Sequence, residues 1–448
     1  MLPVKLGDDH YDSGPTVLTM RWVFEELLAL AGRNLETEIK LQPLQTLARH
    51  YWTGGASLDL AADPAQTIEN IARFADRSEA LGYEAFSAAC KRIHHSLLQP
   101  FLKSQRPTPW GLAAAMPIRD VLGINPFESY WHALGRYFKD PRLRQLFGRY
   151  ATYCGSSPFK APATLMLVAD VEAGGVWILE GGMAKLANCL ETCARDAGVV
   201  FHFNCQASRI EVTGGRATAV IDTHGNRHAS TAVIVNADCN GLYNGLFGDA
   251  LKPLGTPCPA ERRSLSAVTW CGTSTDQGVA LQHHNVFFSD DYEKEFRELK
   301  DGPAQDPTVY LCDQGQRRKL VLVNAPANGK DAPPDIEHRM IRRLQDCGLK
   351  LEFEAVFRRT PADFAKLYPA TSGALYGRAS HGWLSTFQRP KARSKIPGLY
   401  LAGGSTHPGP GVPMAALAGL RAAEALMEDR ALTSACLPTA ITGGILMP

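Results

Sequence analysis

The residues best suited to chemistry in this chain lie near its C-terminus, between Gly403 and Gly411. Eight of these nine residues are Gly, Ser, Thr or Pro. A strand is predicted before them over Gly398–Ala402. A helix is predicted after them from about Pro413 to Met427, and proline suits the first helical position because it has no N–H to leave unpaired. Loop N–H groups and the positive end of a helix dipole form a binding site for negative charge. The segment therefore predicts a cradle for a flat cofactor such as a flavin, whose N1/O2 edge the helix start would stabilise. The alternative is a tight turn without a ligand.

Two further segments fit the same interpretation. Asp12-Ser13-Gly14-Pro15-Thr16 is predicted to be a short turn that could lay backbone against a ring, and the alternative, which this segment favours when taken alone, is a plain turn. Gly181-Gly182-Met183 opens a predicted helix, and a strand is predicted after that helix over Val199–Phe203. Asn236-Ala237-Asp238 ends a further predicted strand, so these segments bracket a βαβ-like half domain. Each signal is weak by itself, and their order along the chain is the more specific feature.

Composition narrows the classes of protein that the chain represents. Its 448 residues predict two to four domains at roughly 100–200 residues each. The net charge of +2 disfavours nucleic-acid binding. No apolar run reaches the ~18 residues of a membrane span. Eleven cysteines, with no signal-peptide core in MLPVKLGDDH, are typical of reduced thiols in a cytoplasmic protein.

The middle of the chain divides by pattern. Residues 65–155 are predicted to be mainly helical and are rich in aromatics, notably over Phe101–Tyr153. That stretch is either an ordinary helical subdomain or a surface that dips into a bilayer. Residues 262–357 are predicted to form an α+β unit, in which Leu349 to Phe357 alternates between apolar and polar residues like a strand with one wet face.

Several segments together resemble the phytoene-desaturase-type carotenoid oxidoreductases, which are flavoproteins. The segments are DSGPTVLTM (Asp12–Met20), Ser157–Met183, VNAD (Val235–Asp238), GALYGRASHGW (Gly373–Trp383) with Gln388-Arg389-Pro390, and LYLAGGSTHPGPGVPMAALAGLRAAEAL (Leu399–Leu426). Within that family the amino-acid sequence of these segments is most similar to that of the hydroxycarotenoid 3,4-desaturases, also called methoxyneurosporene dehydrogenases. The resemblance covers essentially the whole chain.

The resemblance implies a mixed α/β fold. We expect a Rossmann-like FAD-binding domain whose first βαβ unit is missing, an inserted substrate-binding sheet domain and a helical subdomain. The expected divisions are 1–64 and 156–250 for the FAD domain, 65–155 for the helical, membrane-facing subdomain, 251–372 for the substrate domain and 373–448 for the C-terminal FAD-binding segment. The cofactor FAD would be held by Asp12, Gly14, Pro15, Thr16, Asn236, Asp238, Gly403, Gly404, Ser405, Thr406, Gly411, Val412, Pro413 and Met414, with no metal.

Two departures from the family pattern stand out. Family members open with a G-x-G-x-x-G loop that binds the ADP half of FAD, and this chain has none. We therefore expect the 448 residues to begin after that unit and to bind FAD poorly by themselves, because the pyrophosphate loses a helix N-terminus. The second departure is Pro410, where the family usually has a small residue.

The expected function is FAD-dependent desaturation of a carotenoid, at C-3,4 of an acyclic 1-hydroxycarotenoid such as hydroxyneurosporene, by hydride transfer to the flavin. The alternatives are a phytoene desaturase or another amine-oxidase-like flavoprotein, and an inactive truncated remnant. The resemblance implies a lipophilic polyene as partner, no nucleic acid, an unidentified electron acceptor, and a cytoplasmic protein peripherally associated with the inner membrane.

No residue is singled out as the catalytic base. His381 and His407 are suggestive by position, yet the sequence favours structural roles for both. Cys189 and Cys193 are four residues apart on a predicted helix without further ligands, so packing is favoured over metal binding. The adjacent pair His283-His284 lacks metal-ligand spacing and is predicted to lie at the surface.

Overall fold

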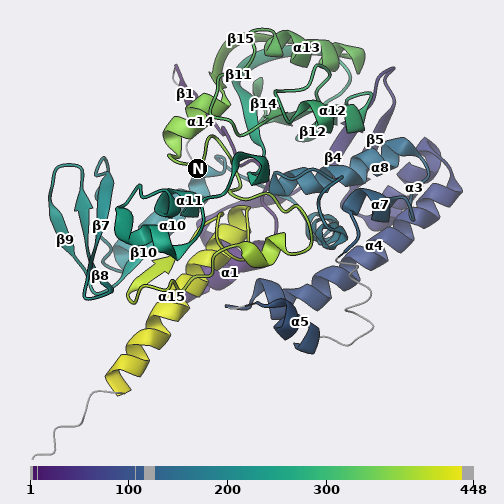
Figure 1. The fold of residues 1–448 in the computed structure, drawn as a ribbon. Helices are drawn as coiled ribbons and strands as arrows, with labels where there is room; N and C mark the ends of the chain where they lie inside the picture. Colours follow the sequence, from purple (N-terminus) through teal and green to yellow (C-terminus); the bar gives the residue numbers. More distant parts are fainter. Residues whose placement is uncertain (1–3, 8, 106, 116–126, 436–448) are drawn as a thin grey trace, which may run out of the picture.

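The computed structural model describes residues 4–7, 9–105, 107–115 and 127–435, and it confirms a mixed α/β fold (Figure 1). Its largest sheet has seven strands in the order β15-β11-β14-β13-β12-β4-β5. All neighbours in it are antiparallel except β12 and β4, which are parallel. The strands are β4 (Thr46–Tyr51), β5 (Ser57–Ala61), β11 (Ser266–Gly278), β12 (His284–Phe287), β13 (Val309–Asp313), β14 (Arg318–Ala325) and β15 (Leu349–Arg359). The sheet therefore takes strands from both sides of the division expected at residue 64.

One face of this sheet is covered by the amphipathic helix α13 (Ile336–Asp346). Ile336, Met340 and Leu344 recur at helical spacing and are fully buried. They pack against a cluster from the sheet that includes Val268 and Trp270. The other helices that contact the sheet include α3 (Pro64–Phe74), which packs against β5, and α14 (Pro361–Leu367), which packs against β11 and β15, while α12 (Tyr292–Glu298) follows β12. This packing fixes the register of the strands, since a slip of one residue would move the buried side chains to the opposite face.

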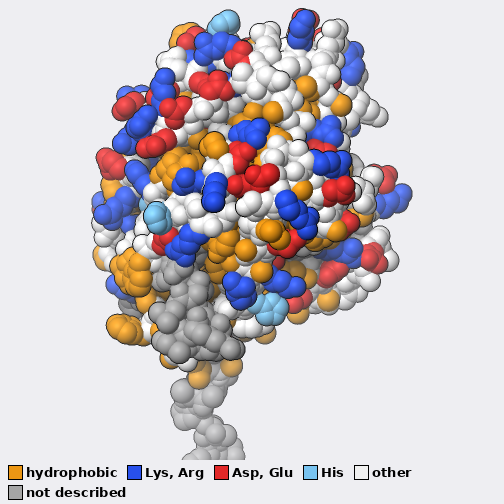
Figure 2. Space-filling view, turned by 90° about the vertical axis from the view of Figure 1, so that its right-hand side faces the viewer, with side chains coloured by type: hydrophobic (Ala, Val, Ile, Leu, Met, Phe, Trp, Pro, Cys, Tyr) orange, Lys and Arg blue, Asp and Glu red, His pale blue; other side chains and the backbone are white. Residues whose placement is uncertain are grey.

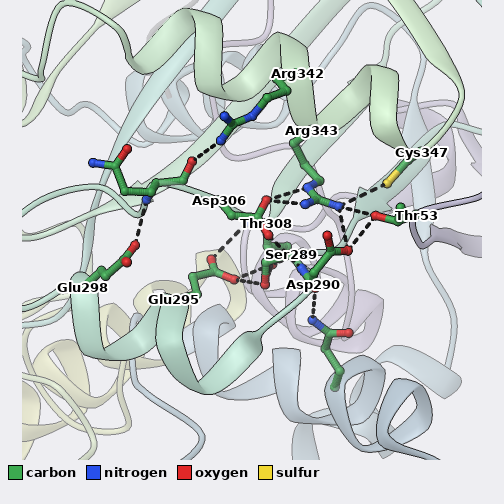
Figure 3. A network of polar contacts seen from close by, with 12 residues as sticks. Thr53, Ser289, Asp290, Glu295, Glu298, Asp306, Thr308, Arg342, Arg343 and Cys347 are labelled. Carbon is green, nitrogen blue, oxygen red and sulfur yellow. Dashed lines mark hydrogen bonds and ion pairs between the residues drawn. The ribbon is translucent and has the colours of Figure 1, made fainter.

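A polar network connects helices α12 and α13 to the end of the sheet (Figure 3). The Arg343 guanidinium of α13 pairs with Asp290 at 3.1 Å and also with Asp306. On α12, the Glu295 carboxylate accepts hydrogen bonds from the hydroxyls of Ser289 and Thr308, each at 2.6 Å. Burial raises the pKa of Glu295 to about 7. The network holds the strand that begins after Thr308 against α12 and α13.

Residues 65–155 are mainly helical, as predicted. Three helices begin with an aspartate that accepts a backbone hydrogen bond, at Asp63, Asp76 and Asp140. The elements are α3 (Pro64–Phe74), α4 (Arg77–Leu97), η1 (Leu98–Leu102), α5 (Pro109–Ala115), α7 (Tyr130–Leu134), α8 (Pro141–Gly148) and η2 (Arg149–Cys154). Most of the large aromatic side chains here form a buried core, so the aromatic content is chiefly packing. The expected membrane-facing stretch is partly untested, because 116–126 lies outside the described residues.

The remaining segments include the elements that hold the C-terminal loop. β10 (Val233–Val235) pairs in parallel with β16 (Leu399–Leu401), and α15 (Val412–Ala435) follows the loop after β16. β1 (Val4–Leu6) and β2 (Asp9–Tyr11) form an antiparallel pair that packs against β15 and β14 of the large sheet. The other elements are α1 (Arg21–Leu30), α2 (Leu35–Glu38), β3 (Leu41–Pro43), η3 (Ala163–Met166), α9 (Leu167–Ala173), β6 (Trp177–Leu179), α10 (Ala184–Asp196), β7 (Ala207–Thr213), β8 (Arg216–Asp222), β9 (Arg227–Ala229), α11 (Cys239–Tyr243), η4 (Asp249–Leu254), η5 (Ala260–Arg262) and η6 (Ser385–Gln388). The predicted strand–loop–helix unit at the C-terminus is confirmed.

One predicted strand is wrong. Val199–Phe203 has an apolar, β-prone sequence, but the structure assigns it no strand. Among the described residues no strand pairs with it, and Val200 and Phe203 are exposed. A strand needs a neighbour for its N–H and C=O groups, so propensity alone does not form one.

Candidate active site

A cavity of about 1240 Å³ runs between the C-terminal loop and the large sheet. Three segments of the predicted cofactor site line it, at residues 13–17, at 236–238, and at 404–405 with 408–415. Apolar side chains from the helical region, including Leu97, Phe101 and Leu112, line it as well. Ligand pockets usually measure about 300–1,000 Å³. The cavity therefore has room for a large cofactor together with a long apolar substrate.

The turn at residues 12–16 is held from two sides. The Asp12 carboxylate accepts a hydrogen bond from the Met183 N–H at 2.8 Å, at the start of α10. The Gln314 side chain both accepts from the Asp12 N–H at 3.0 Å and donates to the Asp12 carbonyl at 2.7 Å. Burial raises the pKa of Asp12, and the N–H groups that it accepts from oppose that rise. Asp12 thus positions the turn, while the following residues face the cavity.

Gly182 is required beside this turn. Its φ is +86°, and a Cβ there would lie 2.7 Å from the Asp12 carboxylate. Only glycine combines that backbone conformation with so close an approach. The predicted Gly181-Gly182-Met183 segment therefore leaves room for the Asp12 carboxylate and binds it.

The C-terminal loop is built by the same kind of contact. Gly403 has a φ of +104°, and a Cβ there would lie 2.3 Å from Asn236 Oδ1 at the end of β10. The Thr406 hydroxyl donates to the Gly403 carbonyl at 2.7 Å, and the Cys239 N–H donates to the Ser405 hydroxyl at 3.1 Å. These contacts fold the loop against the end of the parallel pair β10–β16, where ligands bind in open α/β sheets.

Arg389 supports the loop from behind. Its guanidinium is buried and donates to the carbonyls of Gly404 at 3.0 Å, Arg378 at 2.7 Å and Tyr376 at 3.3 Å. Burial lowers the pKa of Arg389 below the usual arginine value. The side chain lines the large cavity and also a neighbouring cavity of about 420 Å³. It therefore fixes the direction of the Gly404 carbonyl at the cavity wall.

The structure brings most of the sequence-predicted site residues to one cavity. Those that line it are Gly14, Pro15, Thr16, Asn236, Asp238, Gly404, Ser405, Gly411, Val412, Pro413 and Met414. Asp12, Gly403 and Thr406 are outside the lining and act through the hydrogen bonds and close contacts described above. That the predicted site residues, both those in the lining and those outside it, contact the cofactor stays a prediction.

The two histidines near the loop are buried or half-buried and hydrogen-bonded. His407 Nε2 donates to the Ser104 carbonyl at 3.0 Å, and His381 Nε2 accepts from the Ser157 N–H at 3.1 Å. Burial lowers the pKa of each to about 4. Neither belongs to the cavity lining. This geometry agrees with the structural roles that the sequence favours.

Sequence reasoning missed a buried polar cluster in the cavity wall. Arg149 of η2 pairs with Glu172 of α9 at 3.2 Å, and the Tyr153 hydroxyl donates to Glu172 at 2.6 Å. The Arg149 Nε–H also donates to His50 at 3.0 Å. No spacing in the sequence joins these residues, because Glu172 on α9 and His50 on β4 are distant in the chain from Arg149 and Tyr153 on η2.

The surface placement predicted for His283 and His284 is wrong. His284 lies on β12, an interior strand of the sheet, and is 3% exposed. Its Nδ1 lies 2.7 Å from the Tyr310 hydroxyl on β13. The sequence contains no signal for this contact, because it depends on the pairing of the two strands.

The arrangement of loop, parallel strands and cavity agrees with comparison to known proteins. Residues 3–427 match the model of the flavin-containing amine oxidoreductases. The chain belongs to this family. It is 43% identical to a hydroxyneurosporene desaturase of Rubrivivax gelatinosus, over 99% of this chain and 89% of that protein. It is 26% identical to a 1-hydroxycarotenoid 3,4-desaturase of a Flavobacterium species, over 96% of this chain and 91% of that protein. An engineered putrescine oxidase shares the fold, with a TM-score of 0.56, 12% identity and coverage of 96% of this chain and 90% of that one.

The cavity fits the flavin of this family at its ring-binding end. Gly404 is the loop glycine that combines a φ outside the left-handed region with an open Cβ position: an added Cβ would meet only Pro410 Cα, at 3.8 Å, so its backbone is open toward the cavity. The start of the long helix α15, at Val412 and Pro413, lines the same space. FAD is therefore the cofactor of this flavin-containing oxidoreductase. The G-x-G-x-x-G loop that holds pyrophosphate in such folds is not among these 448 residues.

Proposed function

We propose that this protein is an FAD-dependent carotenoid desaturase that introduces the C-3,4 double bond into an acyclic 1-hydroxycarotenoid such as hydroxyneurosporene. The observation that carries the proposal is the single cavity that joins the glycine-rich loop to a long apolar wall. The 43% identity to a hydroxyneurosporene desaturase supports the substrate class.

The residues of the chain divide the work of such a reaction. When bound, the flavin takes up the hydride that leaves one allylic carbon. The neighbouring carbon loses a proton, and the electron pair left behind forms the new C=C bond. Gly404 and the start of α15 would hold the ring, with the helix N-terminus favouring the negative charge that develops on it. Apolar residues such as Leu97, Phe101 and Leu112 would keep water from the polyene and align it with the ring.

The test uses a bacterial host that accumulates the 1-hydroxycarotenoid and produces this chain. We expect a product lighter by two hydrogen atoms, with absorption bands at longer wavelength because the polyene is extended. Parallel hosts that supply phytoene or no carotenoid control for other desaturations. Conversion of phytoene in place of the hydroxylated substrate would favour a phytoene desaturase. Flavin-loaded protein that converts neither would contradict the proposal.

We also propose that the protein works at a membrane surface on the cytoplasmic side. None of the described helices combines the length and the apolar character needed to cross a bilayer. Trp110 on α5 is 86% exposed and Phe127 is 79% exposed. Phe127 contacts the ring of Trp383, which lines the cavity. Figure 2 shows hydrophobic and basic side chains next to one another on the lower part of one face. Exposed aromatics beside the cavity would let a lipophilic substrate enter from lipid.

Co-sedimentation with anionic phospholipid vesicles tests this surface. The double variant Trp110→Ser, Phe127→Ser should bind several-fold less protein to the vesicles, since two interfacial aromatics are lost. Phe203→Ser removes another exposed aromatic, 65% exposed, from the segment before β7 and should leave binding unchanged. Equal sedimentation of wild type and the double variant would favour an ordinary helical subdomain.

A further inference from the structure

Three polar side chains form a hydrogen-bonded row in the wall of the otherwise largely apolar cavity. The Thr16 hydroxyl lies 2.8 Å from the Tyr310 hydroxyl, which lies 2.7 Å from His284 Nδ1. Thr16 belongs to the turn at residues 12–16, Tyr310 to β13 and His284 to the adjacent strand β12. Thr16 and Tyr310 line the cavity, and His284 is buried behind them.

The row has a place for one more hydrogen bond on its cavity side. If Thr16 donates to Tyr310 and Tyr310 to His284, a lone pair of Thr16 is left to accept from a ligand. If His284 donates to Tyr310 and Tyr310 to Thr16, the Thr16 O–H is left to donate. In both arrangements His284 Nε2 is buried and has no hydrogen-bond partner among the described residues. The row therefore ends at His284, and a ligand can extend it only at Thr16. A ligand hydroxyl satisfies either arrangement, because it can both donate and accept.

The row is electrically neutral near pH 7. Burial lowers the pKa of His284 well below its ordinary value and raises the pKa of Tyr310 well above its own. A neutral row suits an alcohol better than a carboxylate or an ammonium group, which would need a counter-charge in so buried a place.

The second polar cluster of the cavity is less suited to a ligand. The Glu172 carboxylate already accepts from Tyr150, Tyr153 and Arg149, and the Arg149 Nε–H is taken by His50. Charge and hydrogen bonds are thus balanced within the cluster. Of the two clusters, the row that begins at Thr16 is the one that can form a further hydrogen bond with a ligand.

The chemistry of the proposed substrate sets where its hydroxyl must lie. An oxygen on C1 is three bonds from C3 and four from C4, about 4–5 Å along an extended chain. The hydroxyl therefore has to sit next to the carbons that lose hydrogen, and so next to the flavin ring. Thr16 is placed in the cavity where this requirement applies, because its turn lines the same cavity as Gly404 and the start of α15.

We propose that Thr16 and Tyr310, backed by His284, bind the 1-hydroxyl group of the carotenoid and thereby place C3 and C4 beside the flavin. This inference rests on the proposed function and names the residues that select the hydroxylated substrate. Hydrocarbon end groups would leave the same polar row facing an apolar chain, which costs binding free energy.

Isosteric variants test the row. Tyr310→Phe and Thr16→Val remove a hydroxyl each and keep the shape of the wall. For the hydroxylated carotenoid, each should lower kcat/KM by about tenfold to a hundredfold, the range of a lost buried hydrogen bond. For a non-hydroxylated acyclic carotenoid, the kcat/KM of Tyr310→Phe should be unchanged or higher. Thr16→Val is compared by the ratio of kcat/KM for the two substrates, because Thr16 also belongs to the turn predicted to hold FAD and a change in FAD affinity would affect both substrates equally. Tyr292→Phe removes the hydroxyl of another buried tyrosine in the cavity wall and should leave the ratio of the two substrates unchanged.

Binding measured without turnover separates this inference from the proposed function. Wild-type protein titrated with each carotenoid should bind the hydroxylated one about tenfold more tightly, and Tyr310→Phe should abolish the difference. One result would overturn this inference and leave the proposed function standing. In it, the wild type desaturates the hydroxylated substrate, and the variants keep the full preference for binding that substrate. Absence of both turnover and preference in the wild type would overturn both.

Discussion

Replacement of Gly404 by valine is the sharpest test of the flavin site. An ideal Cβ at this position would have one neighbour within 4 Å, Pro410 Cα at 3.8 Å, which is ordinary van der Waals contact. The backbone there is not in the left-handed region. The polypeptide itself therefore has room for a side chain, and a glycine is needed only if a ligand fills the space.

The expected magnitudes follow from that geometry. Replacing glycine where the backbone is compatible raises the free energy of unfolding by up to about 1 kcal/mol, so the fold should not suffer. A flavin ring packed against the Gly404 backbone would be displaced by the new side chain. Overpacking of a filled site costs about 1–3 kcal/mol. At 1.4 kcal/mol per factor of ten, flavin affinity should fall by about 5- to 150-fold.

The assay is flavin fluorescence quenching during titration of apoprotein with FAD, paired with urea unfolding of the same samples. Gly403→Ala is the matched control, because its φ of +104° and the 2.3 Å approach to Asn236 make it a requirement of the fold. It should lose about 1–3 kcal/mol of stability. Flavin affinity within twofold of wild type in folded Gly404→Val protein would refute the placement of the ring.

Three further predictions concern buried charges. Glu295 keeps its proton up to about pH 7 in the folded state, whereas the unfolded side chain ionises near its ordinary pKa of 4.5. The free energy of unfolding should therefore fall by about 3 kcal/mol as pH rises from 4.5 to 7, with little further change above. Urea unfolding should show this decrease in wild type and in the exposed control Glu293→Gln, whereas the profile of Glu295→Gln should lack about 3 kcal/mol of it over the same pH range; equal slopes would contradict it. Asp12→Ala removes an acceptor for N–H groups at the start of α10, and we expect a loss of about 1–2 kcal/mol in chemical denaturation. Glu172→Gln leaves the buried Arg149 without its counter-charge and should lower the free energy of unfolding by about 3–5 kcal/mol, measured at pH 7; a loss below 1 kcal/mol would show that the pair is dispensable.

Local structure was well determined by the sequence. The strand before Gly403 and the helix after Gly411 follow from an apolar run, a glycine-rich turn and a proline at the helix start. The apolar spacing of Ile336, Met340 and Leu344 determined α13 in the same way. These are short-range effects, fixed by backbone preferences and by the periodicity of one element. The residues that line the cofactor end of the cavity could be predicted because they belong to such local turns.

The tertiary structure decided what those elements assemble into. β4 joins the large sheet by pairing with β12, whose residues are more than two hundred positions later in the chain. The hydrogen bond between Thr16 and Tyr310 spans 294 positions, and the Arg149–Glu172 pair joins a 3-10 turn to a helix. Propensity failed at Val199–Phe203, where no described neighbour completes a strand. The identity of a threonine or a tyrosine does not predict its hydrogen-bond partner, because hydrogen bonds between distant residues depend on which surfaces the packing brings together. The sequence by itself therefore determined the turns that line the cavity at the C-terminal loop, and only the packing of the sheet against them decided which polar groups share that cavity.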